Sequence, residues 1–310
     1  MAEIVLVHGI DQQQQTADSL ENIWIPALAG GVRIAGFEDV ADLIADQSGA
    51  RRLKTKMAFY GNLFLKKDQQ GDDPGEFSDA EAAFAEQLAL EWLTNAANRA
   101  KDPKTFDSAN RELRVVASLL EEEQGTGSAA RTAINSLAKI RWFAPVAMSI
   151  AERYVRKSLA QVTRYFLDSA IREAAVGEVI KLIGPETKVV VSHSLGSVVA
   201  YEAIQMSSHG LPLLITLGSP LGLQTIIYQR LHPQPPTYPV NLKRWVNVAD
   251  REDFIAAEPN LKGMFGRTVP EGAVFEDDYT VDNGAEPHRS GFYLGKAEVG
   301  RAVGQTLSVQ

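Results

Sequence analysis

A buried strand, a sharp turn and a helix follow one another over residues 189–205, and this segment constrains the fold more than any other. Three consecutive valines at 189–191 are typical of a buried strand, and residues 197–205 are typical of a helix. The turn between them reads Ser-His-Ser-Leu-Gly over residues 192–196, a Ser-x-Ser-x-Gly version of the nucleophile elbow. On such a turn a serine projects its hydroxyl above the sheet, with the N-terminus of the helix behind it. The segment therefore predicts that Ser194 is a nucleophile, and it makes hydrolysis the first chemistry to consider.

Strands and helices alternate on both sides of this segment. Short apolar runs predict strands at Ile4–Val7, Met57–Gly61, Leu213–Leu217 and Trp245–Val248, with a last short strand at Val274 and Phe275. Helical patterns predict helices over residues 19–29, 37–45, 165–183 and 296–307. Strands separated by helices predict an α/β fold, with a mostly parallel sheet and helices on both of its faces.

A long helical stretch interrupts the alternation between about residues 62 and 160. Within it, Phe84, Leu88 and Trp92 follow one another at intervals of four, as on one face of a helix. Helices are expected over residues 80–100, 112–122 and 129–160, the last one interrupted or kinked near Pro145. Because strands resume afterwards, we interpret this stretch as a helical cap inserted into a single domain that spans residues 1–310.

One apolar stretch of the insertion, residues 142–150, has two interpretations. It could be a lid that contacts acyl chains or transiently touches a membrane surface. It could also be a helix packed on the sheet-forming part of the chain, which we favour because apolar stripes are usually core.

Composition excludes several classes of function. The formal net charge of -8 argues against a general nucleic-acid-binding protein, which would present a basic face. The chain has no cysteine, which excludes a disulfide, a thiolate nucleophile and a cysteine metal site, and is compatible with a reducing cytoplasm. No window reaches the roughly 18 apolar residues that span a bilayer, and the N-terminus lacks the basic segment of a signal peptide. We therefore expect a soluble, cytoplasmic protein.

A serine nucleophile needs a base, and the order of residues along the chain selects one of the five histidines. Where a serine stands on such an elbow, the acid follows it and the histidine comes last. His288 alone lies beyond the last predicted strand. His8 ends the first strand, where it would help to shape the loop, and His193 is held within the turn itself. His209 follows the elbow helix, and His232 lies in a proline-rich stretch.

The acid that orients the base is expected just after the strand at residues 245–248. Asp250, Glu252 and Asp253 all lie there. We favour Asp253, because the apolar pair that follows it, phenylalanine and isoleucine, can anchor the loop in the core. Asp250 stays open as the alternative acid.

Two backbone N–H groups are candidates for holding an oxyanion. The first belongs to Leu195, which directly follows the predicted nucleophile at the start of its helix. The second belongs to Ile10, which follows His8 and Gly9 at the end of the first strand.

Five motifs together resemble the α/β-hydrolase superfamily, and within it most closely the lipase-type and intracellular phospholipase-type branches. They are His-Gly-Ile at 8–10, Ser-His-Ser-Leu-Gly-Ser at 192–197, Thr-Leu-Gly-Ser-Pro at 216–220, Trp-Val-Asn-Val-Ala-Asp-Arg-Glu-Asp at 245–253, and His288. The resemblance covers the chain before about residue 61 and after about residue 165, but not the helical insertion. It departs from the common elbow at Ser192, where glycine is usual, and we expect the sheet to lack the first strands of a full hydrolase sheet.

The resemblance implies an α/β-hydrolase fold and a serine esterase that cleaves a carboxylic ester through an acyl-enzyme. Its acid usually lies a few residues past the strand, which supports Asp253. It requires neither a metal nor an organic cofactor, and the expected substrate is a lipid or another small acyl ester. Two alternatives remain: the fold retained as a non-catalytic binding module, and the same triad serving a thioesterase or an acyltransferase. The acyl chain, the leaving group and the oligomeric state are left open.

Overall fold

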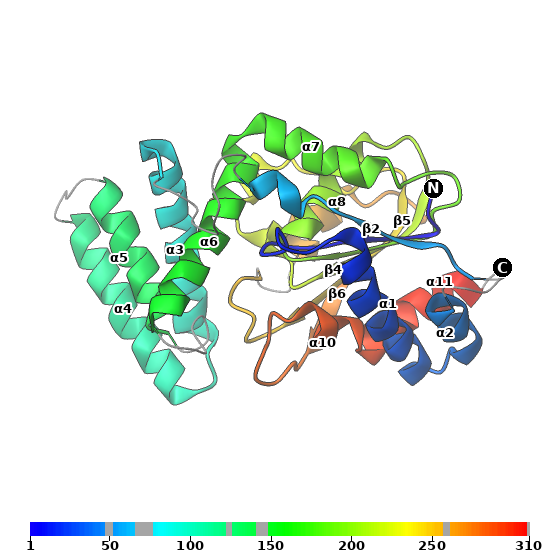
Figure 1. Ribbon diagram of the computed structural model, residues 1–310, viewed down its shortest axis with the longest axis horizontal. Coiled ribbons are helices and arrows are strands. Elements are labelled where there is room, and N and C mark those ends of the chain that lie inside the picture. Colours follow the sequence, from blue (N-terminus) through cyan, green and yellow to red (C-terminus); the bar gives the residue numbers. More distant parts are fainter. Residues whose placement is uncertain (47–51, 66–76, 122–125, 141–147, 257–260, 309–310) are drawn as a thin grey trace. The chain divides into compact units, whose positions relative to one another are not determined.

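The computed structural model of the protein describes residues 1–46, 52–65, 77–121, 126–140, 148–256 and 261–308. The chain divides into two compact units (Figure 1). The sheet unit comprises residues 1–63 and 172–310, and the helical unit comprises residues 64–171. The insertion expected at about residues 62–160 falls almost entirely within the helical unit.

The strands of the described residues form one parallel sheet in the order β2-β1-β3-β4-β5-β6. They are β1 (Ile4–Val7), β2 (Thr55–Ala58), β3 (Val189–His193), β4 (Leu211–Leu217), β5 (Leu242–Asp250) and β6 (Val274–Val281). The expected α/β class is confirmed, because helices surround this parallel sheet (Figure 1). The strand order changes direction at β1, with β2 on one side and all later strands on the other. Open α/β sheets bind ligands outside the carboxyl ends of the strands at such a switch point, here the ends of β1 and β3.

The helices divide between the flanks of the sheet and the helical unit. The longer ones that precede or follow the strands are α1 (Ala17–Ile34), α2 (Glu38–Ala45), α7 (Ser169–Ile180), α8 (Leu195–Met206) and α11 (Ala297–Ser308). The short ones are α9 (Lys262–Phe265), α10 (Ser290–Leu294), η1 (Gly61–Phe64), η2 (Pro220–Gly222), η3 (Tyr228–Arg230) and η4 (Gly266–Thr268). The helical unit contains α3 (Asp79–Arg99), α4 (Pro103–Glu121), α5 (Thr126–Ala138) and α6 (Met148–Leu167).

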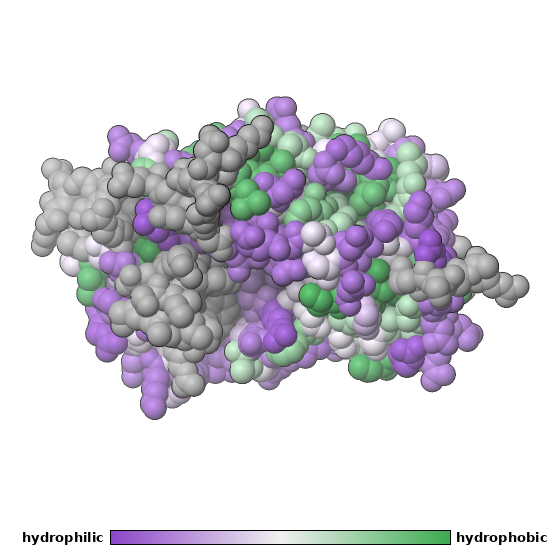
Figure 2. All heavy atoms as spheres, in the orientation of Figure 1, coloured by the Kyte–Doolittle hydropathy of each residue, from purple (hydrophilic) through white to green (hydrophobic). Residues whose placement is uncertain are grey.

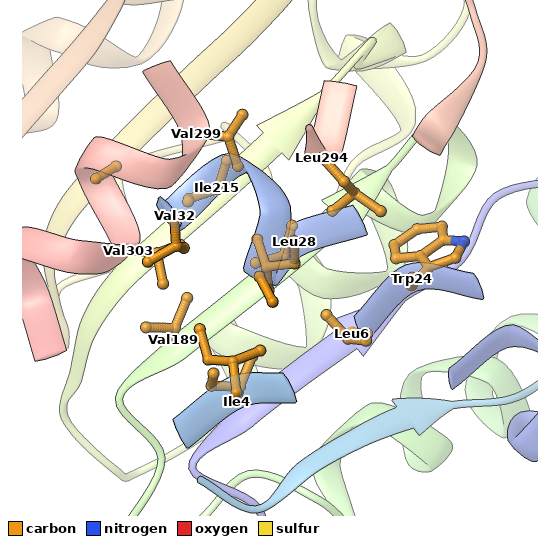
Figure 3. Close-up of a cluster of buried hydrophobic side chains, with 14 of the residues drawn as sticks. Ile4, Leu6, Trp24, Leu28, Val32, Val189, Ile215, Leu294, Val299 and Val303 are labelled. Carbon is orange, nitrogen blue, oxygen red and sulfur yellow. The ribbon is translucent and has the colours of Figure 1, made fainter. Parts of the chain in front are cut away.

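The main core lies between one face of the sheet and α1, α2, α10 and α11. Side chains alternate between the two faces along a strand. Ile4 and Leu6 of β1 and Val189 of β3 therefore reach the same side, where they join Trp24 and Leu28 of α1 in one buried cluster (Figure 3). The helices α7 and α8 lie over the opposite face (Figure 1). β1 and β3 are buried along their whole length, as is typical of parallel strands covered on both faces.

The single helix predicted over residues 165–183 is wrong, because the structure contains two helices there. α6 ends at Leu167, and α7 begins at Ser169. Asp168 stands between them and caps the second helix: its Oδ1 accepts the backbone N–H of Ala170 at 2.9 Å and of Ile171 at 3.2 Å. The N–H groups at the start of a helix lack partners within that helix, and a carboxylate in this position accepts hydrogen bonds from them. Asp168 therefore favours the start of a second helix over continuation of the first.

The last strand is longer than its apolar residues indicate. Only Val274 and Phe275 predict it, whereas β6 continues through an acidic stretch to Val281. Two of the acidic side chains have partners: Glu276 accepts hydrogen bonds from Arg244 of β5, the shorter at 2.7 Å, and Asp277 accepts the backbone N–H of Lys262. These bonds stabilise a polar segment at the edge of the sheet.

In the helical unit, α3 packs against α4, α5 and α6. The predicted stripe of Phe84, Leu88 and Trp92 is buried, which confirms the helical interpretation of this segment. A capping box begins the helix, in which Ser78 and Glu81 each bond the other's backbone N–H. Of the apolar stretch at 142–150, residues 142–147 lie outside the described residues, so its two interpretations stay open.

Large apolar side chains gather mainly inside, and the surface is mixed. Figure 2 shows polar and apolar residues interspersed over the face that it draws. Among the residues that the structure describes, no helix combines the length and the apolar character needed to cross a membrane.

A buried ion pair joins α7 to α8. Arg172 Nε donates to Glu202 Oε2 at 2.9 Å, and the backbone N–H of His232 donates to the same carboxylate at 3.0 Å. Glu202 is only 3% exposed. Glu202→Ala would leave the arginine buried without this counter-charge, so we expect it to lower the free energy of unfolding by about 3–5 kcal/mol in urea denaturation.

The matched control removes an exposed carboxylate from α7. Glu178 pairs with Lys181, whose side chain is 69% exposed, and exposed pairs contribute at most about 1 kcal/mol. Equal losses of stability for Glu178→Ala and Glu202→Ala would contradict the role given to the buried pair.

Candidate active site

The elbow serine stands at the carboxyl end of β3 in a strained conformation. Ser194 has φ 54° and ψ -132°, and among the described residues only Asp11 is another non-glycine residue with positive φ. Such conformations cost of order 1–3 kcal/mol and persist only where the surroundings enforce them. Here the backbone N–H of Ser194 donates to the Leu217 carbonyl at 3.0 Å, and Ser197 Oγ donates to the Ser194 carbonyl at 2.7 Å. Both backbone polar groups of the serine are thus fixed, which turns its side chain away from the sheet.

The residues around the serine are small because the end of β1 passes close by. A Cβ at Gly196 would overlap the carbonyl oxygen of His8, and a Cβ at Gly9 would lie 2.7 Å from the Cβ of Ser194. Ser192 fits where glycine is common, since its Oγ donates to the Ile215 carbonyl of β4 at 3.0 Å. The departure from the usual elbow is therefore accommodated by one buried hydrogen bond.

The structure brings the three residues of the predicted triad into one hydrogen-bonded line. His288 Nε2 lies 2.9 Å from Ser194 Oγ. On the other side of the ring, His288 Nδ1 lies 2.8 Å and 2.7 Å from the two carboxylate oxygens of Asp253. A carboxylate only accepts, so Nδ1 carries a proton and Nε2 is left to accept the serine hydroxyl proton. The arrangement meets the requirement of a nucleophile in contact with a base that an acid orients.

Asp250, the alternative acid, is not brought to His288. Its carboxylate accepts the backbone N–H of Glu252 at 2.8 Å and that of Asn283. Burial, as the largest cause, raises the pKa of this carboxyl above its ordinary value. Asp250 therefore holds two loops together, the one that carries Asp253 and the one that leads to His288.

Tyr293 of α10 is a member of the site that the sequence interpretation missed. Its hydroxyl donates to Asp253 Oδ2 at 2.8 Å and accepts the backbone N–H of Asp250 at 2.8 Å. Burial and the nearby carboxylate of Asp253 raise the pKa of this phenol well above its ordinary value, so it remains a donor. No local motif marks this tyrosine, which only follows His288 by five residues.

His8 shapes the loop that carries the second candidate oxyanion donor. Its Nδ1 donates to the Gly9 carbonyl at 2.7 Å, and its Nε2 accepts the backbone N–H of Tyr60 at 3.2 Å. Burial lowers the pKa of His8 to about 4, so the ring is neutral and can make both bonds. His8 therefore stabilises the loop at the end of β1 through these two hydrogen bonds, and its ring nitrogens do not bond a triad residue.

The two candidate oxyanion donors follow the ends of β1 and β3. Leu195 is the first residue of α8, where an N–H has no partner within the helix. Ile10 directly follows Gly9, whose backbone contacts the serine, and its carbonyl accepts Gln12 Nε2 at 3.1 Å. Asp11, with φ 64°, completes the turn. Both N–H groups stay predictions as oxyanion donors, and their position at the ends of β1 and β3 is the one that such donors need.

Gly218, at the end of β4, leaves the space that the side chains of Asp253 and His288 occupy. It has φ 52°, and a Cβ there would lie 2.6 Å from Asp253 Oδ2 and 3.3 Å from His288 Nδ1. The motif at 216–220 indicates a turn, but only the fold reveals which side chains the turn must admit.

We expect Gly218→Ala to lower kcat by roughly 100-fold, the effect of displacing a catalytic group by about 1 Å. Gly272→Ala is the matched control, since Gly272 has φ 80° with open space around its Cβ position. It imposes the same kind of backbone strain, so it should cost stability and leave kcat unchanged. Ester hydrolysis and thermal denaturation of both variants separate crowding of the triad from strain; equal values of kcat would rule out crowding.

The assembled site supports nucleophilic chemistry by its own side chains. Within the described ranges, no group of three or more histidine, aspartate or glutamate residues is placed to hold a metal ion. The sequence located Ser194, Asp253 and His288, whereas Gly218 and Tyr293 become visible only in three dimensions. No protein-family model, no curated protein and no solved structure matches this chain.

Proposed function

We propose that this chain is a serine hydrolase of the α/β-hydrolase fold, which cleaves a carboxylic ester through an acyl-enzyme. The observation that carries the proposal is the 2.9 Å distance from Ser194 Oγ to His288 Nε2, with Asp253 bonded to the far side of the ring. The strained elbow, and its place at the switch point of a parallel sheet, support the assignment of the finer fold.

The reaction begins when Ser194 Oγ attacks the ester carbonyl carbon and passes its proton to His288 Nε2. Asp253 stabilises the imidazolium that forms. The carbonyl oxygen takes the negative charge and accepts hydrogen bonds from the N–H groups of Ile10 and Leu195. When the tetrahedral intermediate collapses, His288 returns the proton to the departing alcohol, and the acyl group remains on the serine.

Water completes the cycle. His288 takes a proton from the water, which attacks the acyl carbon, and then returns a proton to Ser194 as the carboxylic acid leaves. The reacting groups are the chain's own side chains and backbone N–H groups. The substrate class, a lipid or another small acyl ester with transient contact to a membrane surface, rests on the resemblance and on the apolar stretch at 142–150.

The test is covalent labelling of the full chain with a fluorophosphonate. We expect one adduct per chain, located on Ser194 by peptide mass spectrometry, because only an activated serine reacts rapidly with this probe. Hydrolysis of p-nitrophenyl esters from acetyl to palmitoyl then gives the preferred acyl length. Added alcohols, and thioester substrates, show whether the acyl-enzyme serves transfer or thioester cleavage instead.

A folded chain that neither takes up the probe nor hydrolyses any ester would refute the proposal. That outcome would favour a binding module that keeps the fold without the reaction. An adduct on a serine other than Ser194 would refute the assignment of the nucleophile.

A further inference from the structure

His193, the residue inside the elbow, is bonded to the catalytic histidine rather than to solvent. Its Nε2 lies 2.9 Å from the backbone carbonyl oxygen of His288. A carbonyl oxygen only accepts, so His193 Nε2 must carry the proton and donate. The residue directly before the nucleophile therefore holds the main chain of the base, which comes from a loop 95 residues farther along the chain.

The ring of His193 is enclosed on several sides. Its centroid lies 4.6 Å from that of His288, 6.0 Å from that of Tyr293 and 6.3 Å from that of Trp24. Its Nδ1 faces Gly9, at whose position a Cβ would come within 3.3 Å. The side chain is buried, with 7% of its surface exposed. It spans the space between the oxyanion loop and the base.

His193 is neutral in this environment. Burial is the largest cause that lowers its pKa well below the ordinary value, and the electrostatic influence of the neighbouring His288 lowers it further. The ring faces His288, Tyr293, Trp24 and the backbone of Gly9, and His8 also acts on it electrostatically. A neutral ring matters because a second positive charge at this distance would oppose formation of the imidazolium on His288.

We propose that His193 is a positioning residue that fixes His288 at hydrogen-bonding distance from Ser194, by donating from Nε2 to the His288 carbonyl. This inference rests on the proposed function, because it assigns a role in the same reaction. The elbow then sets two members of the triad at once: its serine supplies the nucleophile, and its histidine anchors the loop of the base. Asp253, which accepts a hydrogen bond from Tyr293, holds the ring of His288, and His193 holds its backbone.

Two substitutions of His193 separate the effect of its hydrogen bond from the effect of its aromatic ring. His193→Gln can place an amide N–H where Nε2 stands, whereas His193→Phe keeps an aromatic ring and loses the donor. We expect His193→Phe to reduce kcat, and the rate of fluorophosphonate labelling, by about 10- to 100-fold with KM unchanged. His193→Gln should restore most of the rate. His209→Phe, a substitution outside the site, is the control for loss of a histidine.

The outcomes distinguish this inference from the proposed function. Wild-type labelling at Ser194 together with a slow His193→Phe variant supports both. Wild-type labelling with an equally fast His193→Phe variant overturns the positioning role alone, whereas an unlabelled wild type overturns both. If His193→Gln is as slow as His193→Phe, the result also contradicts a positioning role for the hydrogen bond.

A measurement on the unaltered chain keeps the inference testable if His193→Phe fails to fold. Nitrogen-15 NMR of the imidazole rings identifies which nitrogen of each histidine carries a proton. We expect His193 as the neutral Nε2–H tautomer at neutral pH. A proton on Nδ1 alone would leave no donor toward His288, and would overturn the inference.

Discussion

Ser194→Ala is expected to abolish ester hydrolysis, lowering kcat by about 10⁶-fold, as loss of the nucleophile does in serine hydrolases. Without Oγ, His288 Nε2 has no hydroxyl to deprotonate and no acyl-enzyme can form. The alanine still has to adopt φ 54°, so the variant should keep the fold and a similar stability. The measurements are kcat with the best p-nitrophenyl ester, labelling by the fluorophosphonate, and urea denaturation.

Ser194→Gly sharpens this prediction, because glycine adopts positive φ without strain. It should be as inactive as the alanine variant and more stable than the wild type by roughly 1 kcal/mol. Ser207→Ala, at the far end of α8, is the matched control and should keep full activity. More than about 1% of wild-type activity in Ser194→Ala would contradict a role as the nucleophile.

Asp253→Asn is expected to lower kcat by about 10⁴-fold, because an amide can turn its NH₂ toward His288 and select the wrong tautomer of the ring. The carboxylate oxygens of Asp253 accept from His288 Nδ1, from the Tyr293 hydroxyl at 2.8 Å and from the backbone N–H of Ala256 at 3.2 Å. The amide nitrogen of the variant must therefore face a donor wherever it lies. A pH profile and kcat at saturating ester report the loss.

Asp250→Asn is the comparison that decides between the two acids. Both oxygens of Asp250 accept backbone N–H groups, from Glu252 and Asn283. In the asparagine variant the side-chain NH₂ replaces one of these oxygens, so it faces a backbone N–H and that hydrogen bond is lost. We expect a loss of about 1–3 kcal/mol in the free energy of unfolding and a change in kcat below about 10-fold. If Asp250→Asn were the inactive variant and Asp253→Asn the active one, the acid would be assigned wrongly.

The parts of the site that the sequence predicts are those marked by local patterns. The valine run and the small residues of the elbow locate Ser194, and chain order singles out His288. Between the two acids, the deciding signal is the apolar pair after Asp253, Phe254 and Ile255, both of which are buried. That pair anchors the loop as expected.

The parts that the sequence leaves open depend on contacts between distant segments. Gly218, His193 and Tyr293 come from three different elements, and each acts on His288 or Asp253 through a contact that no spacing rule encodes. The break at Asp168 was missed for a different reason: a polar residue inside a helical pattern can either face solvent or cap a new helix. Tertiary structure decides between these two outcomes.

In the described part of the chain, the side chains that form the hydrogen-bonded network around Ser194 belong to the sheet unit, whereas residues 64–171 form a unit of their own. Long insertions into a connection add little to the entropy of closing it. The inserted helices can therefore change in length while Ser194, Asp253 and His288 keep their positions in the sheet unit. The residues of the proposed reaction and the inserted helices are thus encoded by different stretches of the chain.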